Sequence, residues 1–142
     1  MAVAPPAQGT TLSGWGRFPR VPTLLAAPRD EAGLRALLAA GPMVARGAGR
    51  AYGDSAVSPG RTVAMRHFDR MIAFDPARGQ FVAEAGLRLA EVIATCLPRG
   101  WFPAVTPGTR FVTLGGAIAA DVHGKNHHRD GILDVSIVPA RV

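Results

Sequence analysis

A glycine-rich loop limits the folds that this chain can adopt, because a short apolar segment, "PMVARG" (42–47), runs directly into "RGAGRAYGDSAVSPGR" (46–61). The first three glycines of the loop have the spacing G-x-G-x-x-x-G, one residue longer than the dinucleotide fingerprint of a Rossmann fold. The Ser58-Pro59-Gly60 sequence that follows cannot begin the helix on which a Rossmann site holds its pyrophosphate. The chain also lacks the G-K-[ST] sequence of a P-loop. Two alternatives remain: an ordinary tight turn, or a loop whose backbone N–H groups approach a diphosphate closely, flanked by Arg46 and Arg50.

A second glycine segment favours the diphosphate alternative. Pro107-Gly108-Thr109 predicts a turn, and "TLGGAIAAD" (113–121) predicts a short helix capped by Thr113. Gly115 and Gly116 in its first turn lower helix propensity by about 1 kcal/mol each relative to alanine. A sequence accepts that loss where another backbone or a ligand must come close. Two such segments in one small domain predict an extended anionic cofactor lying between them.

The rest of the chain predicts a mixed α+β domain rather than a regular βαβ array. Residues 28–41 have helical spacing, with Asp30 as the cap, an apolar face formed by Leu34, Leu37 and Leu38, and Gly41 at the end. "MIAFD" (71–75) turns through "PARG" into "QFVAEAG" (80–86), which is typical of a hairpin. The other predicted elements are strands over 42–47, 62–68 and 132–142 and a helix over 88–100.

Composition limits the classes of partner and compartment. The net charge of +6 comes almost wholly from arginines that occur singly, without the aromatic interleaving of a base-stacking groove, which disfavours nucleic acid. One cysteine permits no internal disulfide, and Cys96 lies in an apolar run that predicts a buried thiol. We find no signal peptide and no apolar run of the ~20 residues that a membrane span needs. We therefore expect a cytoplasmic location, with a periplasmic or membrane-associated one as the alternative, and a flexible leader over residues 1–13.

The segment "HGKNHH" (123–128) contains the only lysine and three of the four histidines. A metal site is one interpretation, since His123 and His127 are four residues apart and Asp121 is near. Gly124 and the asparagine after the lysine are poor helix residues, and no cysteine or second carboxylate cluster completes such a site, so we predict no metal. A solvated surface loop is the second interpretation. The third is a catalytic loop that groups a cation, imidazoles and an amide around a polar substrate.

Three segments carry a resemblance to a known family: "GWGRFPR", "ARGAGRAYGDSAV" and "PGTRFVTLGGAIAADVHGKNHHRDG". In order and spacing they resemble the FAD-dependent decaprenylphosphoryl-β-D-ribose 2′-oxidases, a family of the vanillyl-alcohol-oxidase-like group, over residues 12–131. The resemblance implies a two-part α+β FAD-binding domain of the PCMH type, here residues 14–142. Family members continue into a substrate domain that this chain lacks, so we expect an incomplete domain that is inactive by itself.

The same resemblance implies the residues of the site. His123 and Gly124 lie against the isoalloxazine ring, and Lys125 faces the substrate sugar. A lysine suits that place because its ammonium is a compact charge with three rotatable donors, whereas arginine is a wide planar fork. The catalytic residues implied are Lys125 and His123. The cofactor-binding residues implied are Arg46, Gly47, Ala48, Gly49, Arg50, Ala51, Tyr52, Gly53, Pro107, Gly108, Thr109, Thr113, Gly115, Gly116, Ala117, Ile118, His123, Gly124 and Asn126.

The implied reaction is the oxidation of a secondary alcohol of a sugar or lipid-linked sugar, by hydride transfer to FAD that an external electron acceptor then reoxidises. In the family this step serves an arabinan precursor for cell-wall biogenesis. We expect the FAD to be non-covalent, because Arg50 stands where covalent relatives can have a histidine. Three alternatives stay open: an aldonolactone or alditol oxidase, a non-catalytic flavin-binding or partner-binding fragment, and a nucleic-acid binder.

Overall fold

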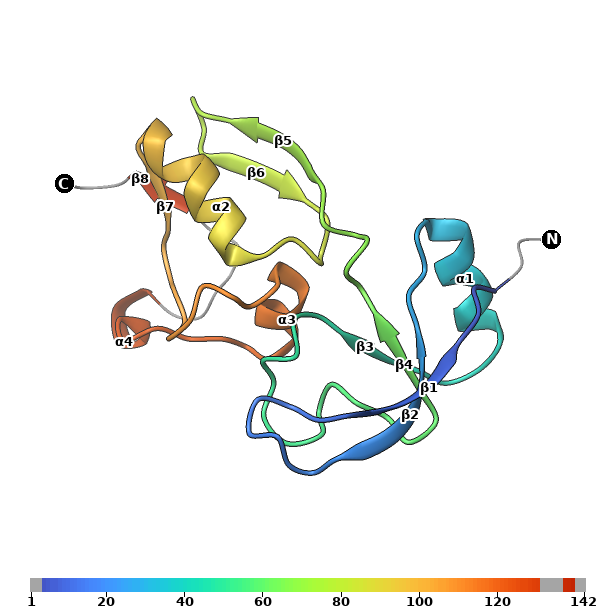
Figure 1. Ribbon diagram of the computed structural model, residues 1–142. Helices are drawn as coiled ribbons and strands as arrows, with labels where there is room; N and C mark the ends of the chain where they lie inside the picture. The colour runs from blue at the N-terminus through green and yellow to red at the C-terminus, as the bar shows by residue number, and fades with distance from the viewer. Residues whose placement is uncertain (1–3, 131–136, 140–142) are drawn as a thin grey trace. The chain divides into compact units, whose positions relative to one another are not determined.

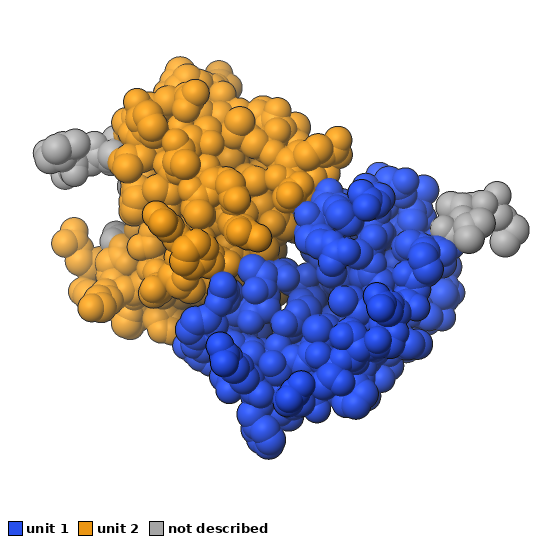
Figure 2. All heavy atoms as spheres, viewed as in Figure 1, with its two compact units in different colours: residues 1–68 blue, residues 69–142 orange. Residues whose placement is uncertain are grey.

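The computed structural model describes residues 4–130 and 137–139, and within them the chain folds as two units, residues 1–68 and 69–142 (Figure 2). Both units combine helices with strands (Figure 1), so the predicted α+β class is confirmed. The predicted glycine loop lies in the first unit, and the second glycine segment and the histidine segment lie in the second.

Unit 1 is built on a four-stranded mixed sheet with the strand order β1-β2-β4-β3. β1 pairs antiparallel with β2, whereas β2 and β3 both pair parallel with β4. Two parallel neighbours of one strand require crossover connections, which α1 and the glycine loop provide. The elements are β1 (Gln8–Leu12), β2 (Val21–Ala26), α1 (Glu31–Ala39), β3 (Val44–Arg46) and β4 (Arg61–Ala64).

The core of unit 1 lies between its sheet and α1, where Ala26, Leu37 and Val63 are buried together. The Asp30 carboxylate accepts from the Gly33 N–H at 2.7 Å and caps the helix as predicted. Leu38, which we expected on the buried face, is exposed, because one step along a helix turns a side chain by about 100°. The apolar face of α1 is therefore narrower than the sequence suggested.

The expectation of a flexible leader over residues 1–13 is wrong for residues 8–12. They form β1, which pairs with β2 in an unbroken register from Gln8↔Leu25 to Leu12↔Val21. The segment "QGTTL" has no apolar alternation and therefore no strand signal of its own. It becomes a strand because an edge strand gains its hydrogen bonds from its neighbour, here a strand that the sequence analysis also missed.

Unit 2 contains the predicted hairpin, with β5 antiparallel to β6. Gly79 in its turn has φ +65°, and the Trp101 indole N–H donates to the Pro76 carbonyl at 2.9 Å across the same turn. The predicted helix over 88–100 is confirmed as α2 followed by a 3-10 turn. The elements are β5 (Met71–Asp75), β6 (Gln80–Ala83), α2 (Leu89–Cys96), η1 (Leu97–Arg99), β7 (Trp101–Pro103), α3 (Leu114–Ala119), α4 (His127–Asp130) and β8 (Ile137–Pro139).

One face of α2 forms the core of unit 2, where Leu87, Leu89, Val92 and Cys96 are buried. The prediction of a buried Cys96 is confirmed, and burial raises the pKa of its thiol, which keeps it protonated and unreactive. Of the predicted final strand over 132–142, residues 137–139 form β8, which pairs antiparallel with β7, and the remainder falls outside the described residues. The predicted strand over 62–68 ends earlier, at Ala64.

Candidate functional site

The glycine loop connects β3 to β4 without regular structure, as the Ser-Pro-Gly sequence near its end predicted. Gly49 and Gly53 have φ values of +70° and +58°, in the left-handed region that costs other residues about 1–2 kcal/mol. A Cβ added to Gly53 would meet no atom within 4 Å, whereas one added to Gly49 would lie 2.6 Å from Nη2 of Arg46. Gly53 therefore faces open space, and Gly49 makes room for a guanidinium.

Arg46 holds this loop in place. Its Nη2 donates to the Ser13 carbonyl at 2.8 Å, and its Nη1 donates to the Ala56 carbonyl at 3.4 Å. Partial burial lowers the pKa of Arg46, which still leaves the guanidinium charged. Arg46 thus has one backbone partner within the loop and one in the segment between β1 and β2, so its first role is to fix the loop's path.

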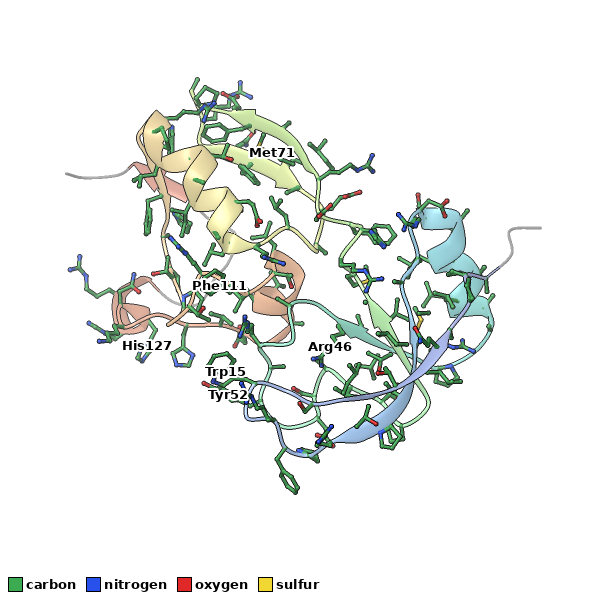
Figure 3. The ribbon with its side chains drawn as sticks, in the orientation of Figure 1. Trp15, Arg46, Tyr52, Met71, Phe111 and His127 are labelled. Atoms are coloured by element: carbon green, nitrogen blue, oxygen red, sulfur yellow. The ribbon has the colours of Figure 1, made fainter. Side chains whose placement is uncertain are left out.

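The segment "GWGRFPR" (14–20) forms a turn before β2 that packs against the same loop. The Trp15 N–H donates to the Ala51 carbonyl at 2.8 Å, and a Cβ on Gly14 would collide with the carbonyl oxygens of Ala51 and Gly53. The Arg50 guanidinium lies 4.9 Å from the centroid of the Trp15 ring, a cation–π distance. Figure 3 shows Trp15 with Tyr52 beside it, at the end of unit 1 away from α1. The two glycines that flank the tryptophan in "GWG" were the available signal.

The second glycine segment forms α3 with the predicted cap, since the Thr113 hydroxyl accepts from the Gly116 N–H at 3.2 Å. A Cβ on Gly115 would lie 2.9 Å from the Cβ of Ala85, whose carbonyl accepts the Gly115 N–H at 2.8 Å. A Cβ on Gly116 would lie 2.9 Å from the Thr113 hydroxyl. The close approach inferred from these glycines is therefore real, and the groups that approach belong to unit 2 itself.

Residues of α3 and of the turn before it differ in exposure to solvent. Ala117 is buried in a small core with Val105, so its methyl group points away from solvent, whereas Ile118 is exposed. In the preceding turn, the Thr109 hydroxyl accepts from the Phe111 N–H at 3.2 Å. A Cβ on Gly108 would meet nothing within 4 Å, so this turn presents bare backbone to open space.

The histidine–lysine segment is braced by its own backbone. The Asn126 amide donates from Nδ2 to the Ala104 carbonyl at 2.9 Å. Gly124 is buried, and a Cβ there would lie 2.6 Å from Oδ1 of Asn126 and 2.8 Å from the Thr106 carbonyl oxygen. Asn126 and Gly124 therefore hold this segment against residues 104–106, while the side chains of His123 and Lys125 are exposed.

Three imidazoles gather beside Lys125. The His123 and His127 rings are 5.3 Å apart edge to face, and the His127 and His128 rings are 5.9 Å apart. Nδ1 of His127 lies 3.0 Å from the Gly124 carbonyl, which can only accept, so Nδ1 carries a proton and Nε2 of the neutral ring is an acceptor. Among the described residues no group of three or more His, Cys, Asp or Glu side chains is placed to hold a metal ion.

A hollow of about 730 Å³ lies elsewhere in unit 1, between residues 5–10 and the beginning of α1. Arg29, Arg66 and His67 line it, and it includes none of the predicted site residues. Its size alone therefore does not make it the functional site.

No helix in the described part of the chain is long and apolar enough to cross a membrane.

Comparison with known proteins decides which cofactor the glycine segments suit. Residues 22–142 match the family model described as FAD binding domain (FAD_binding_4). The chain belongs to this family. FAD is accordingly its cofactor, and the relative described next is named as an oxidase. The predicted family resemblance is confirmed, since the chain is 40% identical over 127 residues to decaprenylphosphoryl-beta-D-ribose oxidase from Mycolicibacterium smegmatis.

The match to that oxidase covers 84% of this chain and 28% of the relative, so the chain spans little more than a quarter of the relative's length. Two solved structures share the fold at 16% identity. Cholesterol oxidase from Brevibacterium sterolicum, in a mutant form, has a TM-score of 0.71 over 83% of this chain and 25% of its own. Alkyldihydroxyacetonephosphate synthase has a TM-score of 0.67 over 85% of this chain and 27% of its own.

The residues of both glycine segments fit FAD by the geometry within each unit. A diphosphate must approach the backbone closely, and a Cβ added to Gly53 or Gly108 would meet no atom within 4 Å, so each glycine has open space on that side. Aromatic rings suit the planar parts of FAD, and the Tyr52 side chain is 80% exposed on the same loop as Gly53. Neither segment has a buried carboxylate that would repel an anion.

Proposed function

We propose that this chain is the FAD-binding part of an oxidoreductase that oxidises a secondary alcohol of a sugar, of the polyprenyl-phosphoryl ribose 2′ type. The observation that carries the proposal is the 40% identity, over 84% of the chain, to a relative named as a decaprenylphosphoryl-beta-D-ribose oxidase. The segment "HGKNHH" supports it, because it groups exposed polar side chains on a braced backbone. Substrate and activity are part of this proposal, since the chain spans 28% of that relative.

The proposed cofactor contacts come from one segment of each unit. In unit 1 they are the backbone N–H groups from Gly47 to Gly53, together with the Tyr52 side chain. Arg46 fixes the path of this loop through its hydrogen bonds to the Ser13 and Ala56 carbonyls. In unit 2 they are the turn at Gly108 and the beginning of α3, where Gly115 packs closely against Ala85 and Gly116 against the Thr113 hydroxyl. We propose that these groups hold the cofactor without a covalent bond, because Arg50 stands at the loop position where covalent relatives can have a histidine, and a guanidinium cannot form that bond.

When bound, FAD supplies the oxidant: the alcohol carbon loses a hydride to it, the hydroxyl loses a proton, and a ketone remains. The chain's own residues position the sugar for that loss. The Lys125 ammonium donates hydrogen bonds to the sugar hydroxyl and stabilises the negative charge that develops on its oxygen. Nε2 of His127 is an acceptor at the imidazole cluster and provides one place for the released proton.

Lys125 is exposed, and Asn126 holds its backbone in place. We therefore expect that replacing the Lys125 side chain affects catalysis without affecting cofactor retention. In an intact enzyme that carries this region, Lys125→Ala should keep its full flavin content and lose most of its turnover. Lys125→Arg keeps the charge but replaces the point donor with a planar fork, so it should restore little activity. A Lys125→Ala enzyme with normal rates would contradict the assigned role.

Gly116→Val provides the opposite case. Its side chain would begin 2.9 Å from the Thr113 hydroxyl and displace the cap of α3, so the enzyme should lose flavin as well as activity. The flavin content of each purified variant, read from its visible absorption, and the initial rate with polyprenyl-phosphoryl ribose test both expectations. A panel with aldonolactones and alditols in place of the ribose separates the related oxidases.

A further inference from the structure

The connection between β1 and β2 presents large apolar rings to solvent. We call residues 15–20, "WGRFPR", the hairpin tip. The Phe18 side chain is 80% exposed and the Trp15 side chain is 57% exposed, while Arg17 and Arg20 are also exposed. Isolated exposed apolar residues are ordinary, but two exposed aromatic rings together with two exposed arginines on one six-residue tip mark an interaction surface.

The backbone presents this tip in a defined conformation. Arg17 has φ +61°, a left-handed conformation that costs a residue with a side chain about 1–2 kcal/mol, and its N–H donates to the Gly14 carbonyl at 3.1 Å. The Trp15 N–H, which donates to the Ala51 carbonyl, anchors this turn to the glycine loop. An unfavourable conformation persists only where the surroundings enforce it, so the tip is a built feature of the fold.

Charge identifies the chemistry of the partner. Residues 1–68 contain eight arginines and three carboxylates, and no carboxylate occurs before Asp30. The two strands of the hairpin contain no charged residue, so its only charges are the two arginines of the tip. A single-stranded nucleic acid needs a groove that tracks many phosphates, and the hollow in unit 1 is lined by other residues. A tip with two rings and two arginines instead suits a lipid interface, where rings enter the boundary region and arginines pair with phosphates.

We propose that the hairpin tip docks the protein on an anionic lipid surface, with Phe18 and Trp15 entering the headgroup region and Arg17 and Arg20 facing lipid phosphates. This proposal rests on the tip alone and goes beyond the proposed function. If both hold, docking places the enzyme at the bilayer in which a polyprenyl-linked sugar resides.

The expected strength is that of a peripheral contact. Each arginine near an anionic surface strengthens partitioning roughly five-fold, so the two together contribute about 25-fold. Burying the Phe18 ring adds roughly another ten-fold or more. The arginine part should disappear on uncharged vesicles and weaken with added salt.

The test is co-sedimentation of the full 142-residue chain with vesicles of phosphatidylglycerol and phosphatidylcholine, and with vesicles of phosphatidylcholine alone. Phe18→Ser should lower binding to the anionic vesicles by roughly ten-fold. The double variant Arg17→Gln/Arg20→Gln should lower it by about 25-fold. Leu38→Ser and Arg29→Gln are the matched controls, because Leu38 is 58% exposed on α1 and Arg29 is exposed outside the tip. Both controls should bind nearly as wild type.

A second readout follows the tip directly. Trp15 emission should shift to the blue on anionic vesicles, and Trp15→Phe should abolish the shift while Trp101 remains. Equal binding by wild type and Phe18→Ser, equal losses in the two controls, or retention on single-stranded DNA in place of vesicles would overturn the proposal. Because vesicle binding is measured without flavin or turnover, these outcomes are independent of the proposed enzymatic function.

Discussion

Replacing Gly14 by alanine tests whether the turn before β2 shapes the glycine loop. A Cβ on Gly14 would collide with the carbonyl oxygens of Ala51 and Gly53, whereas a Cβ on Gly16 would meet nothing within 4 Å. Neither glycine has a positive φ, so alanine adds no backbone strain at either position. The two variants therefore differ in the collision alone, and Gly16→Ala is the control for Gly14→Ala.

The size of the effect follows from what must move. The atoms in the way are backbone carbonyl oxygens rather than flexible side-chain ends, so overpacking should cost about 1–3 kcal/mol. At Gly16 the same exchange reduces the entropy of the unfolded chain and should be neutral or stabilising by up to about 1 kcal/mol. A difference of about 1–4 kcal/mol between the variants is expected, and each 1 kcal/mol corresponds to a shift of roughly 2–8 °C in Tm.

Urea denaturation of both variants measures this difference, with an unchanged m value as the check that the comparison is valid. Because the collision pushes on Ala51 and Gly53, Gly14→Ala should also weaken FAD binding in an intact enzyme by roughly 5- to 100-fold, and Gly16→Ala should not. Equal stability and equal FAD affinity for the two variants would refute the role that we assign to the turn.

Three further expectations follow. Gly79→Ala should destabilise the chain by about 2–5 kcal/mol in thermal unfolding, because Gly79 is left-handed and its Cβ would enter the Trp101 ring, whereas Gly100→Ala, left-handed in open space, should cost only about 1–2 kcal/mol. The Arg70 side-chain hydrogen bond lowers the pKa of Glu84, so stability from this pair is present above the ordinary carboxyl pKa of 4.5 and is lost as the pH falls through the lower folded value. Glu84→Gln should flatten that acid limb of a stability-versus-pH curve, and an unchanged slope would contradict the assignment. Acid precipitation of the intact enzyme should release all flavin into the supernatant, and flavin retained in the pellet would show a covalent bond.

Local signals made α1, α2 and α3, the hairpin and two caps predictable, whereas α4 was not expected. Asp30 and Thr113 cap their helices through contacts three residues away, which a sequence displays directly. The hairpin was visible for the same reason, since two apolar strands flank a glycine-containing turn. β1 was missed because its residues carry no pattern and gain their structure only from pairing with β2.

The long-range contacts of the candidate site could not be predicted in this way. Arg46 resembled a phosphate ligand beside a glycine loop, yet its guanidinium reaches Ser13, 33 residues earlier, and fixes the loop. Gly115 correctly indicated a close approach, but nothing near it in the sequence identified Ala85 as the neighbour. The type of a residue can indicate that a close contact exists, but the partner in that contact is known only from the fold.

The most direct test of the central claim is the anaerobic reduction of the bound flavin in an intact enzyme that carries this region. Polyprenyl-phosphoryl ribose should bleach the visible flavin band in a single turnover, because the alcohol delivers its hydride to FAD. Lys125→Ala with an equal flavin content should bleach at a small fraction of that rate. A wild-type enzyme that holds FAD and is not bleached by this sugar, or one that bleaches equally fast without the lysine, would contradict the account.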